Sequence, residues 1–244
     1  MNYELDGYKV LEIFNQSEVE LILNAISNKI KDSLNKSINK EDLEFLHKNK
    51  KLHNQIVSSP KRYIELPQEI LKTIKNNLIL NNIWETYSSE KYTIFWTGSL
   101  KEKLFKKNAA GFRLVRPEQK QDAAGPHTDK HIGGVYTESN IRFFSIWIPL
   151  NEIGCKESLA LATSSHKVSH PKSELAEAEG KLSIGYKQNY FKKFKIVRPL
   201  LKLGQGIAFD GNLMHGGAFN TLEATRISIE IRFYPQNLIE SIYQ

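Results

Sequence analysis

The segment from Thr225 to Phe233 has the strictest side-chain pattern in the chain. Its polar and apolar residues alternate in the order Arg226, Ile227, Ser228, Ile229, Glu230, Ile231, Arg232 and Phe233. Successive side chains of a strand point to opposite faces, so this alternation predicts a strand with one apolar and one polar face. The apolar face must pack against another layer, while the polar face lies elsewhere.

Several other segments after about residue 91 also have strand character. They are short, rich in β-branched and aromatic residues, and separated by glycine, proline or polar turns. The expected strands are Tyr92–Thr97, Gly111–Arg116, Arg142–Ile148, Ser158–Thr163, Gly206–Phe209 and Thr225–Phe233. Their number and spacing favour a double-sheet jelly roll over a parallel α/β sheet.

Helical periodicity dominates the chain before about residue 90. The sequence Ser17-Glu-Val-Glu20 matches a capping box and predicts the start of a helix. Apolar residues follow at helical spacing, at Val19, Ile22, Ile26 and Ile30. Further helices are expected around Lys40–Lys50 and over Pro67–Leu80, the second with Ile70, Ile74 and Leu78 on one face.

The organisation of the chain favours one domain. No internal repeat or low-complexity linker interrupts its 244 residues, and jelly rolls of this length are often single domains. We therefore expect a mainly β protein with α-helices, in which a mainly helical part at residues 1–90 packs on a jelly-roll, cupin-like core at residues 91–236.

The positive charge of the chain fits two kinds of surface. The formal net charge is +7, and many lysines lie in clusters, such as those at residues 101–107 and 192–195. Solvated helix and loop surface is the simpler of the two; the second is a rim that attracts an anionic small-molecule substrate. No nucleic-acid-binding module accompanies the charge, so a nucleic-acid partner is not expected.

The composition also indicates a compartment. No apolar run approaches the ~18 residues that a transmembrane helix needs, and the acidic segment Met1–Gly7 lacks the apolar region of a secretory signal. Cys155 is the only cysteine, which excludes an intramolecular disulfide and fits a reducing compartment. We expect a cytoplasmic protein with no transmembrane segment; its oligomeric state is not defined by the sequence.

Three residues have the pattern of a metal site. His127 and Asp129 lie two positions apart, so on an extended segment their side chains point to the same side. With His215 they would place two imidazoles and one carboxylate on one face of a metal ion. That facial triad leaves open positions and suits non-haem Fe(II) oxygen chemistry.

A guanidinium and a hydroxyl follow the second histidine. Arg226 lies eleven residues after His215, and Ser228 shares its face of the expected strand. A guanidinium in a desolvated pocket binds a planar carboxylate through two parallel charge-assisted hydrogen bonds. The two residues therefore predict a site for one end of a dicarboxylate.

The histidines also fit two simpler arrangements. His127 with His131, or His166 with His170, has the four-residue spacing of a helical zinc site. Pro126, Pro171 and the glycines after His131 make a sustained helix at either place unattractive. Taken singly, His127 and Asp129 also fit a surface strand with a local hydrogen bond.

In their order along the chain, these motifs resemble the Fe(II)/2-oxoglutarate-dependent dioxygenases, and within them the phytanoyl-CoA dioxygenase-like family. The resemblance runs from about Gly111 to Phe233 and rests on Gly111–Pro117, His127–Asp129, Ser145–Leu150, Glu157–Leu159, Ser165–Lys167, Met214–Gly216 and Arg226–Ser228. It implies a double-stranded β-helix in which His127, Asp129 and His215 hold iron. It further implies that 2-oxoglutarate chelates the metal and pairs with Arg226.

The resemblance also implies a reaction. O2 and 2-oxoglutarate would be consumed, succinate and CO2 released, and a small substrate hydroxylated. Asp129 favours hydroxylation over halide transfer, because related halogenases have a small residue at that position. Trp147 is expected either to wall the cosubstrate pocket or to be a core residue, while Arg113 and Arg116 are either substrate contacts or strand-edge charges.

Two further classes of protein fit the same fold. A cupin-like metal enzyme, such as an isomerase or a cosubstrate-independent oxygenase, would not require Arg226 to bind a dicarboxylate. A non-catalytic jelly-roll binding protein would have little need for all three metal ligands. The identity of the substrate is not defined by the motifs.

Overall fold

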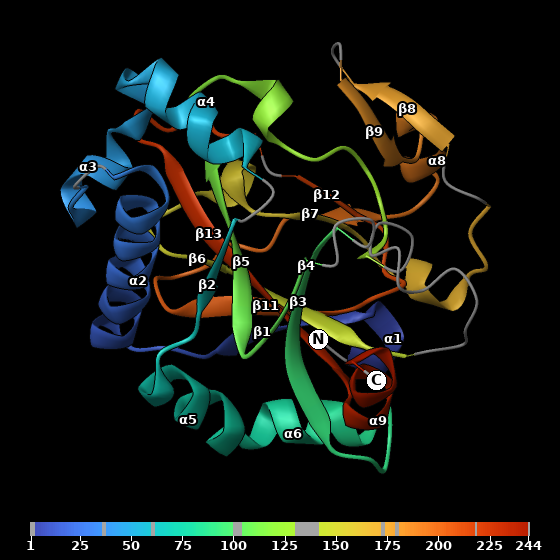
Figure 1. Cartoon of the computed structure of the whole chain (residues 1–244). Coiled ribbons are helices and arrows are strands. Elements are labelled where there is room, and N and C mark those ends of the chain that lie inside the picture. Colours follow the sequence, from blue (N-terminus) through green and yellow to red (C-terminus); the bar gives the residue numbers. More distant parts are fainter. Residues whose placement is uncertain are drawn as a thin grey trace.

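The structure is a computed structural model that describes residues 3–35, 38–59, 62–99, 104–129, 142–171, 174–178, 181–217 and 219–243. A large antiparallel sheet and a smaller one face each other, and helices from the first part of the chain cover the outer face of the large sheet (Figure 1). This is the mainly β arrangement with N-terminal helices that the sequence predicts.

Thirteen strands form the sheets of the described part. They are β1 (Tyr8–Glu12), β2 (Tyr63–Glu65), β3 (Tyr92–Ser99), β4 (Leu104–Lys107), β5 (Ala109–Val115), β6 (Phe144–Pro149), β7 (Ala160–Ala162), β8 (Glu174–Ala178), β9 (Lys181–Gly185), β10 (Ile196–Val197), β11 (Gln205–Asp210), β12 (His215–Gly216) and β13 (Arg226–Pro235). The large sheet has the order β1-β11-β6-β13-β3-β4, with β5 on β13 and β2 on β5. The smaller sheet has the order β10-β7-β12, and β8 pairs with β9.

Strand β13 lies at the centre of the large sheet. It pairs with β6 along one edge and with β5 and β3 along the other. Its apolar residues belong to the main core, as its alternation predicts: Ile227, Ile229, Ile231 and Phe233. Its polar residues face the space between the two sheets.

The helices bury their apolar residues against that core. The α-helices are α1 (Tyr3–Asp6), α2 (Gln16–Leu34), α3 (Lys40–Glu44), α4 (Lys50–Ser58), α5 (Gln68–Asn76), α6 (Leu78–Glu85), α8 (Gln188–Phe191) and α9 (Gln236–Tyr243), and the 3-10 helices are η1 (Leu46–Lys48), η2 (Lys120–Asp122), η3 (Cys155–Glu157) and η4 (Ser165–Lys167). None of the described helices is long and apolar enough to cross a bilayer. Ile22 and Ile26 of α2 and Ile70 and Ile74 of α5 are fully buried, which confirms the helical spacing of these residues.

Three helix predictions are wrong in detail. The capping box of α2 is formed by Asn15 and Glu18, two residues before the predicted one, because the Asn15 side chain accepts from the Glu18 amide at 3.0 Å and the Glu18 carboxylate accepts from the Asn15 amide at 2.8 Å. The helix expected over Lys40–Lys50 is divided into α3, η1 and the start of α4.

The third correction concerns Leu78. The helix expected over Pro67–Leu80 ends at Asn76, and the Asn77 side chain caps a new helix by accepting from the amides of Ile79 and Leu80. Leu78 therefore begins α6 and is 75% exposed. It does not share a buried face with Ile70 and Ile74.

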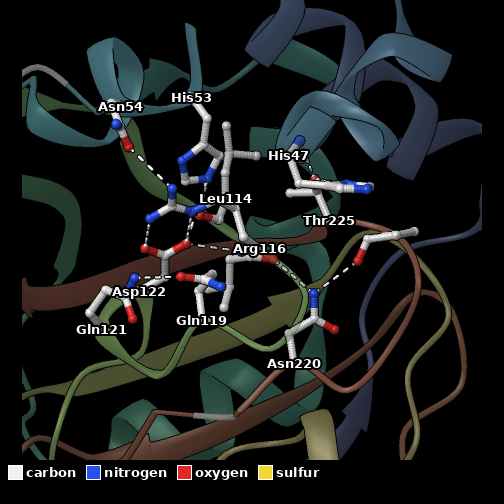
Figure 2. A network of polar contacts seen from close by, with 12 residues as sticks. His47, His53, Asn54, Leu114, Arg116, Gln119, Gln121, Asp122, Asn220 and Thr225 are labelled. Carbon is white, nitrogen blue, oxygen red and sulfur yellow. Dashed lines mark hydrogen bonds and ion pairs between the residues drawn. The ribbon is translucent and has the colours of Figure 1, made fainter. Parts of the chain in front are cut away.

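A polar network ties α4 to the end of β5 and to the segment that follows it, and ties η1 to Thr225 just before β13 (Figure 2). The Arg116 guanidinium donates to both oxygens of Asp122, at 2.7 and 2.8 Å, and to Asn54 Oδ1 at 3.2 Å. The buried His53 ring contacts the Leu114 carbonyl through Nε2 at 3.1 Å. The network therefore fixes the chain just before the His127–Asp129 segment.

His53 makes the stability of this network depend on pH. Burial is the largest cause that lowers its pKa below 6.5; Asp122 partly offsets it, whereas Arg116 and His47 lower the pKa further. Between the folded pKa and 6.5 the unfolded chain binds more protons than the native chain, so native stability falls as pH decreases through this window.

We expect His53→Gln to reduce this loss, because glutamine retains an N–H for the Leu114 carbonyl and takes up no proton. Urea unfolding at pH 7.5, 6.5 and 5.5 measures the free energy of unfolding. Between pH 7.5 and 5.5 the wild type should lose more free energy of unfolding than His53→Gln. The matched control, His170→Gln, should lose as much as the wild type. Equal losses in the wild type and His53→Gln would contradict the assignment.

Candidate metal centre

Two histidines from distant parts of the chain are brought together by backbone pairing. His127 and His215 form an isolated antiparallel bridge in which each amide donates to the other carbonyl at 2.8 Å. Side chains directly opposite each other in such a pair share one face. The ring centroids are accordingly 4.3 Å apart.

Asp129 completes a buried group of three. Its Oδ1 atom lies 3.9 Å from His127 Nε2 and 3.8 Å from His215 Nε2, and one ligand atom from each residue falls within 4.8 Å of the others. Among the described residues this is the only group of three or more histidine, cysteine or acidic side chains able to hold a metal ion. The three predicted ligands therefore converge.

Backbone carbonyls fix both imidazoles. His127 Nδ1 lies 2.7 Å from the Gly125 carbonyl and His215 Nδ1 lies 3.0 Å from the Leu213 carbonyl. A carbonyl can only accept, so each Nδ1 carries the proton and donates it. Each Nε2 then presents a lone pair to the group, as metal-binding histidines with such partners do.

The protonation of the group also suits a cation. Burial, followed by the neighbouring His215, holds the pKa of His127 well below its ordinary value, which keeps its imidazole neutral. Burial alone would raise the pKa of Asp129, but Arg232, His215 and a hydrogen bond from Ser145 outweigh it, so the pKa of this carboxyl is lowered. The group thus combines a neutral His127 imidazole with an ionised Asp129 carboxylate.

Three residues to which the motif analysis assigned no role hold Asp129 in place. Ser145 Oγ donates to Oδ2 at 2.5 Å, and the Arg232 guanidinium donates to Oδ1 at 3.1 Å. Glu230 in turn accepts from Arg232 Nε at 2.5 Å. Glu230 and Arg232 lie on the polar face of β13, so the alternation contained the signal for both.

Arg226 and Ser228 occupy the same polar face of β13, and both are buried. Arg226 is 2% exposed; it donates to the Glu157 carbonyl at 3.2 Å and lies 5.4 Å from the ring centroid of Trp147. Its Nε and the buried Ser228 Oγ have no hydrogen-bond partner in the part of the chain that the structure describes. Burial, and then the nearby Arg113, lower the pKa of Arg226 to about 9, so the attraction of Glu157 does not balance this buried charge.

Glu157 supports the loop that contacts Arg226. Its buried carboxylate accepts from the amides of Gly154, at 3.0 Å, and Thr221, at 3.2 Å, and from the Thr221 hydroxyl. These contacts hold the Glu157 carbonyl against Arg226. The motif Glu157–Leu159 was selected from the sequence, but this role of Glu157 was not.

The two arginines proposed as substrate contacts separate. Arg113 pairs in register with Ser228, so its side chain extends from the same face as Ser228, toward the space between the sheets. Arg116 instead forms the two-pronged ion pair with Asp122 that Figure 2 shows. The structure therefore brings Arg113 to the site and does not bring Arg116 there.

His166 and His170 lie apart from the group. His170 contacts the Tyr190 hydroxyl and the Asn212 carbonyl, each at 3.2 Å, and His166 Nε2 lies 3.3 Å from the Glu4 carbonyl. His131 lies outside the described residues. Neither His166 nor His170 is placed in a zinc site by the described structure.

Comparisons with known proteins agree with this architecture. No protein-family model matches the chain, and no curated protein matches its sequence. The crystal structure of EctD from S. alaskensis with 2-oxoglutarate and 5-hydroxyectoine is similar over 96% of this chain and 74% of its own, with a TM-score of 0.60 and 18% identity.

Two proteins of nogalamycin biosynthesis are similar as well. The epimerase SnoN, in complex with Fe3+, alpha ketoglutarate and nogalamycin RO, matches 95% of this chain and 80% of its own, with a TM-score of 0.55 and 11% identity. The non-heme alpha ketoglutarate dependent carbocyclase SnoK matches 95% and 81%, with a TM-score of 0.56 and 10% identity. At such identities the likeness concerns the fold, and it confirms that this chain has the predicted double-stranded β-helix with flanking helices.

Proposed function

We propose that this chain is an Fe(II)- and 2-oxoglutarate-dependent oxygenase that acts on a small molecule. One observation carries the proposal: Arg226 Nε and Ser228 Oγ are buried without hydrogen-bond partners among the described residues. Both lie on the face of β13 that is directed toward the three-ligand group. A buried donor without a partner is costly. A dicarboxylate that chelates a metal ion at one end and meets Arg226 and Ser228 at the other would satisfy both donors.

The residues fit iron as well as the cosubstrate. Two imidazoles and one carboxylate on a single face leave positions open for further ligands. His127, Asp129 and His215 would hold the metal, Ser145 and Arg232 would orient the carboxylate, and Trp147 would wall the pocket beside Arg226. When bound, iron and 2-oxoglutarate supply the oxidation of the substrate by O2, with release of succinate and CO2.

Hydroxylation is the outcome that we propose among several. The structural neighbours include enzymes named as an epimerase and a carbocyclase, so the fold does not define the product. Asp129 supports hydroxylation over halide transfer, because its carboxylate fills the position that a halide would need. From the motifs alone, we also propose that the chain belongs to the phytanoyl-CoA dioxygenase-like family.

The two rival classes account for less of the site. A cupin-like enzyme without a cosubstrate has no use for a buried Arg226 beside unpartnered donors, and a binding protein has no use for three converging metal ligands. Cys155 is free and exposed, which supports the cytoplasm as the proposed compartment. We also propose that the substrate is anionic.

The reaction is tested by reconstitution without oxygen. Purified protein receives Fe(II) and 2-oxoglutarate anaerobically, and succinate is measured after O2 is added. The proposal expects succinate that depends on the protein, on Fe(II) and on O2. Absence of succinate above the protein-free control, in metal-loaded protein, would favour one of the two rival classes.

The metal ligands are tested by binding. We expect one Fe(II) per chain, and we expect His127→Ala or His215→Ala to remove most of the binding, because a methyl group cannot replace a ligand nitrogen. Anaerobic titration with Co(II), followed by its absorption spectrum, provides a second readout that needs no turnover. His166→Ala should bind as the wild type does, and wild-type affinity in both ligand variants would refute the site.

Arg226 is tested through the cosubstrate. In Zn(II)-loaded protein, calorimetry should show that Arg226→Ala loses 2-oxoglutarate affinity by on the order of 2–5 kcal/mol, mostly through the carboxylate left unpaired. Arg226→Lys should regain only part of it, because an ammonium lacks the planar fork. Zinc affinity should be retained in both variants. Unchanged 2-oxoglutarate affinity in Arg226→Ala would place the carboxylate elsewhere.

A further inference from the structure

Arg113 is a cation without a counter-ion among the described residues, and it lies beside the candidate metal centre. It is half-buried on β5, and it faces the same space as Ser228. Its guanidinium is close enough to influence His127, Asp129 and Arg226 electrostatically. Within the described ranges, no hydrogen bond or ion pair engages it.

A second arginine adjoins the first. The Arg62 carbonyl accepts from the Phe112 amide at 3.1 Å, which places Arg62 against β5 next to Arg113. Its Nε donates to the Ser59 carbonyl at 3.2 Å, and no carboxylate of the described residues pairs with it. Burial, followed by the charge of Arg113, lowers the pKa of Arg62. Two neighbouring guanidinium groups therefore repel each other at this place.

The remaining charges near the site already have partners or assigned ligands. Arg232 is paired with Asp129 and Glu230, and Arg226 faces the proposed cosubstrate. Together, Fe(II), Arg226 and Arg232 would carry four positive charges, which the two carboxylates of 2-oxoglutarate, Asp129 and Glu230 would match. The charge of Arg113 is left unbalanced in the fully loaded site, so a further anion would be attracted there.

An aromatic pair lies next to this charge. Gly111 precedes Arg113 by two residues and is in register with Tyr63 and Glu230. The Trp96 indole occupies the space that a side chain would fill at this position, because its Nε1 lies 3.0 Å from the place of a Cβ on Gly111. Trp96 is partly exposed and packs on Tyr63 with ring centroids 4.5 Å apart. Aromatic faces of this kind bind planar or apolar groups.

We propose that Arg113, with Arg62 beside it, binds the carboxylate, sulfate or phosphate group of the primary substrate, and that Trp96, which is backed by the buried Tyr63, contacts the adjoining planar or apolar part. That the bound anion is a substrate rests on the proposed function, whereas the anion site itself rests on the geometry around β5. It selects Arg113 over Arg116, whose guanidinium is already held by Asp122 and Asn54.

Benzenesulfonate is a suitable probe, because it combines a planar ring with an anion that binds metals weakly. Methyl phenyl sulfone is its neutral counterpart. Zn(II)-loaded protein saturated with 2-oxoglutarate is titrated with each by calorimetry at constant ionic strength, since salt screens such pairs. We expect saturable binding of the sulfonate at one site per chain and at least tenfold weaker binding of the sulfone.

The variants assign this binding to Arg113. Arg113→Gln should weaken sulfonate binding by about tenfold or more, and Arg113→Lys should recover part of it. The exposed Arg142, which packs on Tyr87, offers a matched control, and Arg142→Gln should bind as the wild type does. Circular dichroism and zinc stoichiometry verify that each variant is folded.

Several results would overturn the assignment. They are no sulfonate binding by the wild type, equal affinity for the sulfone, unchanged affinity in Arg113→Gln, or a loss in Arg113→Gln of 2-oxoglutarate affinity alone, which would assign Arg113 to the cosubstrate. Affinity for 2-oxoglutarate is measured in the same samples. If 2-oxoglutarate does not bind while the sulfonate still depends on Arg113, the proposed function fails and the anion site stands.

Discussion

The alternation of side chains along β13 is the constraint on which the rest of the structure depends. One extended strand cannot bury Ile227 and Ile229 in the helix-covered core without directing Arg226 and Ser228 into the space between the sheets. A shift of register by one residue would exchange the two sets and would destroy core and site together. Stability and chemistry are therefore specified by the same ten residues.

The N-terminal helices contribute to the site without lining it. They cover the apolar face of the large sheet, and through His53 and Asn54 they hold the end of β5 and the Arg116–Asp122 pair. His47 extends the contact to Thr225, immediately before Arg226, where its amide donates to the Thr225 hydroxyl at 3.2 Å. Both segments that deliver site residues are thus anchored on the same helical layer.

The residues that the sequence revealed are those whose roles follow from periodicity or from ligand chemistry. The strand at Thr225–Phe233, the buried face of α2 and the convergence of His127, Asp129 and His215 all belong to this class. The short strands β1, β2, β10 and β12 were not predicted, because two to five residues carry too little alternation and form only where a partner strand is present. The break at Asn77 is not predicted either, because the apolar pattern continues to Leu80. The Asn77 side chain caps a new helix there and so ends the preceding one.

Contacts between residues far apart in the sequence account for the other site features that the sequence did not predict. Nothing local distinguishes Arg113 from Arg116, and only the pairing of β5 with β13 directs one toward the site while Asp122 takes the other. Likewise, Ser145 and Arg232 gain significance from their contact with Asp129, which lies far from them in the sequence. Such roles are defined by the closed barrel and not by a motif.

The bridge between His127 and His215 has a consequence for the life of the protein in a cell. The two residues lie far apart in the sequence, so the unfolded chain contains no preformed site, and the three ligands meet only when the sheets have closed. A metal ion bound there is a ligand of the native state alone, and mass action then adds its binding free energy to that of folding. The supply of the ion would govern how long the folded protein persists as well as how fast it works.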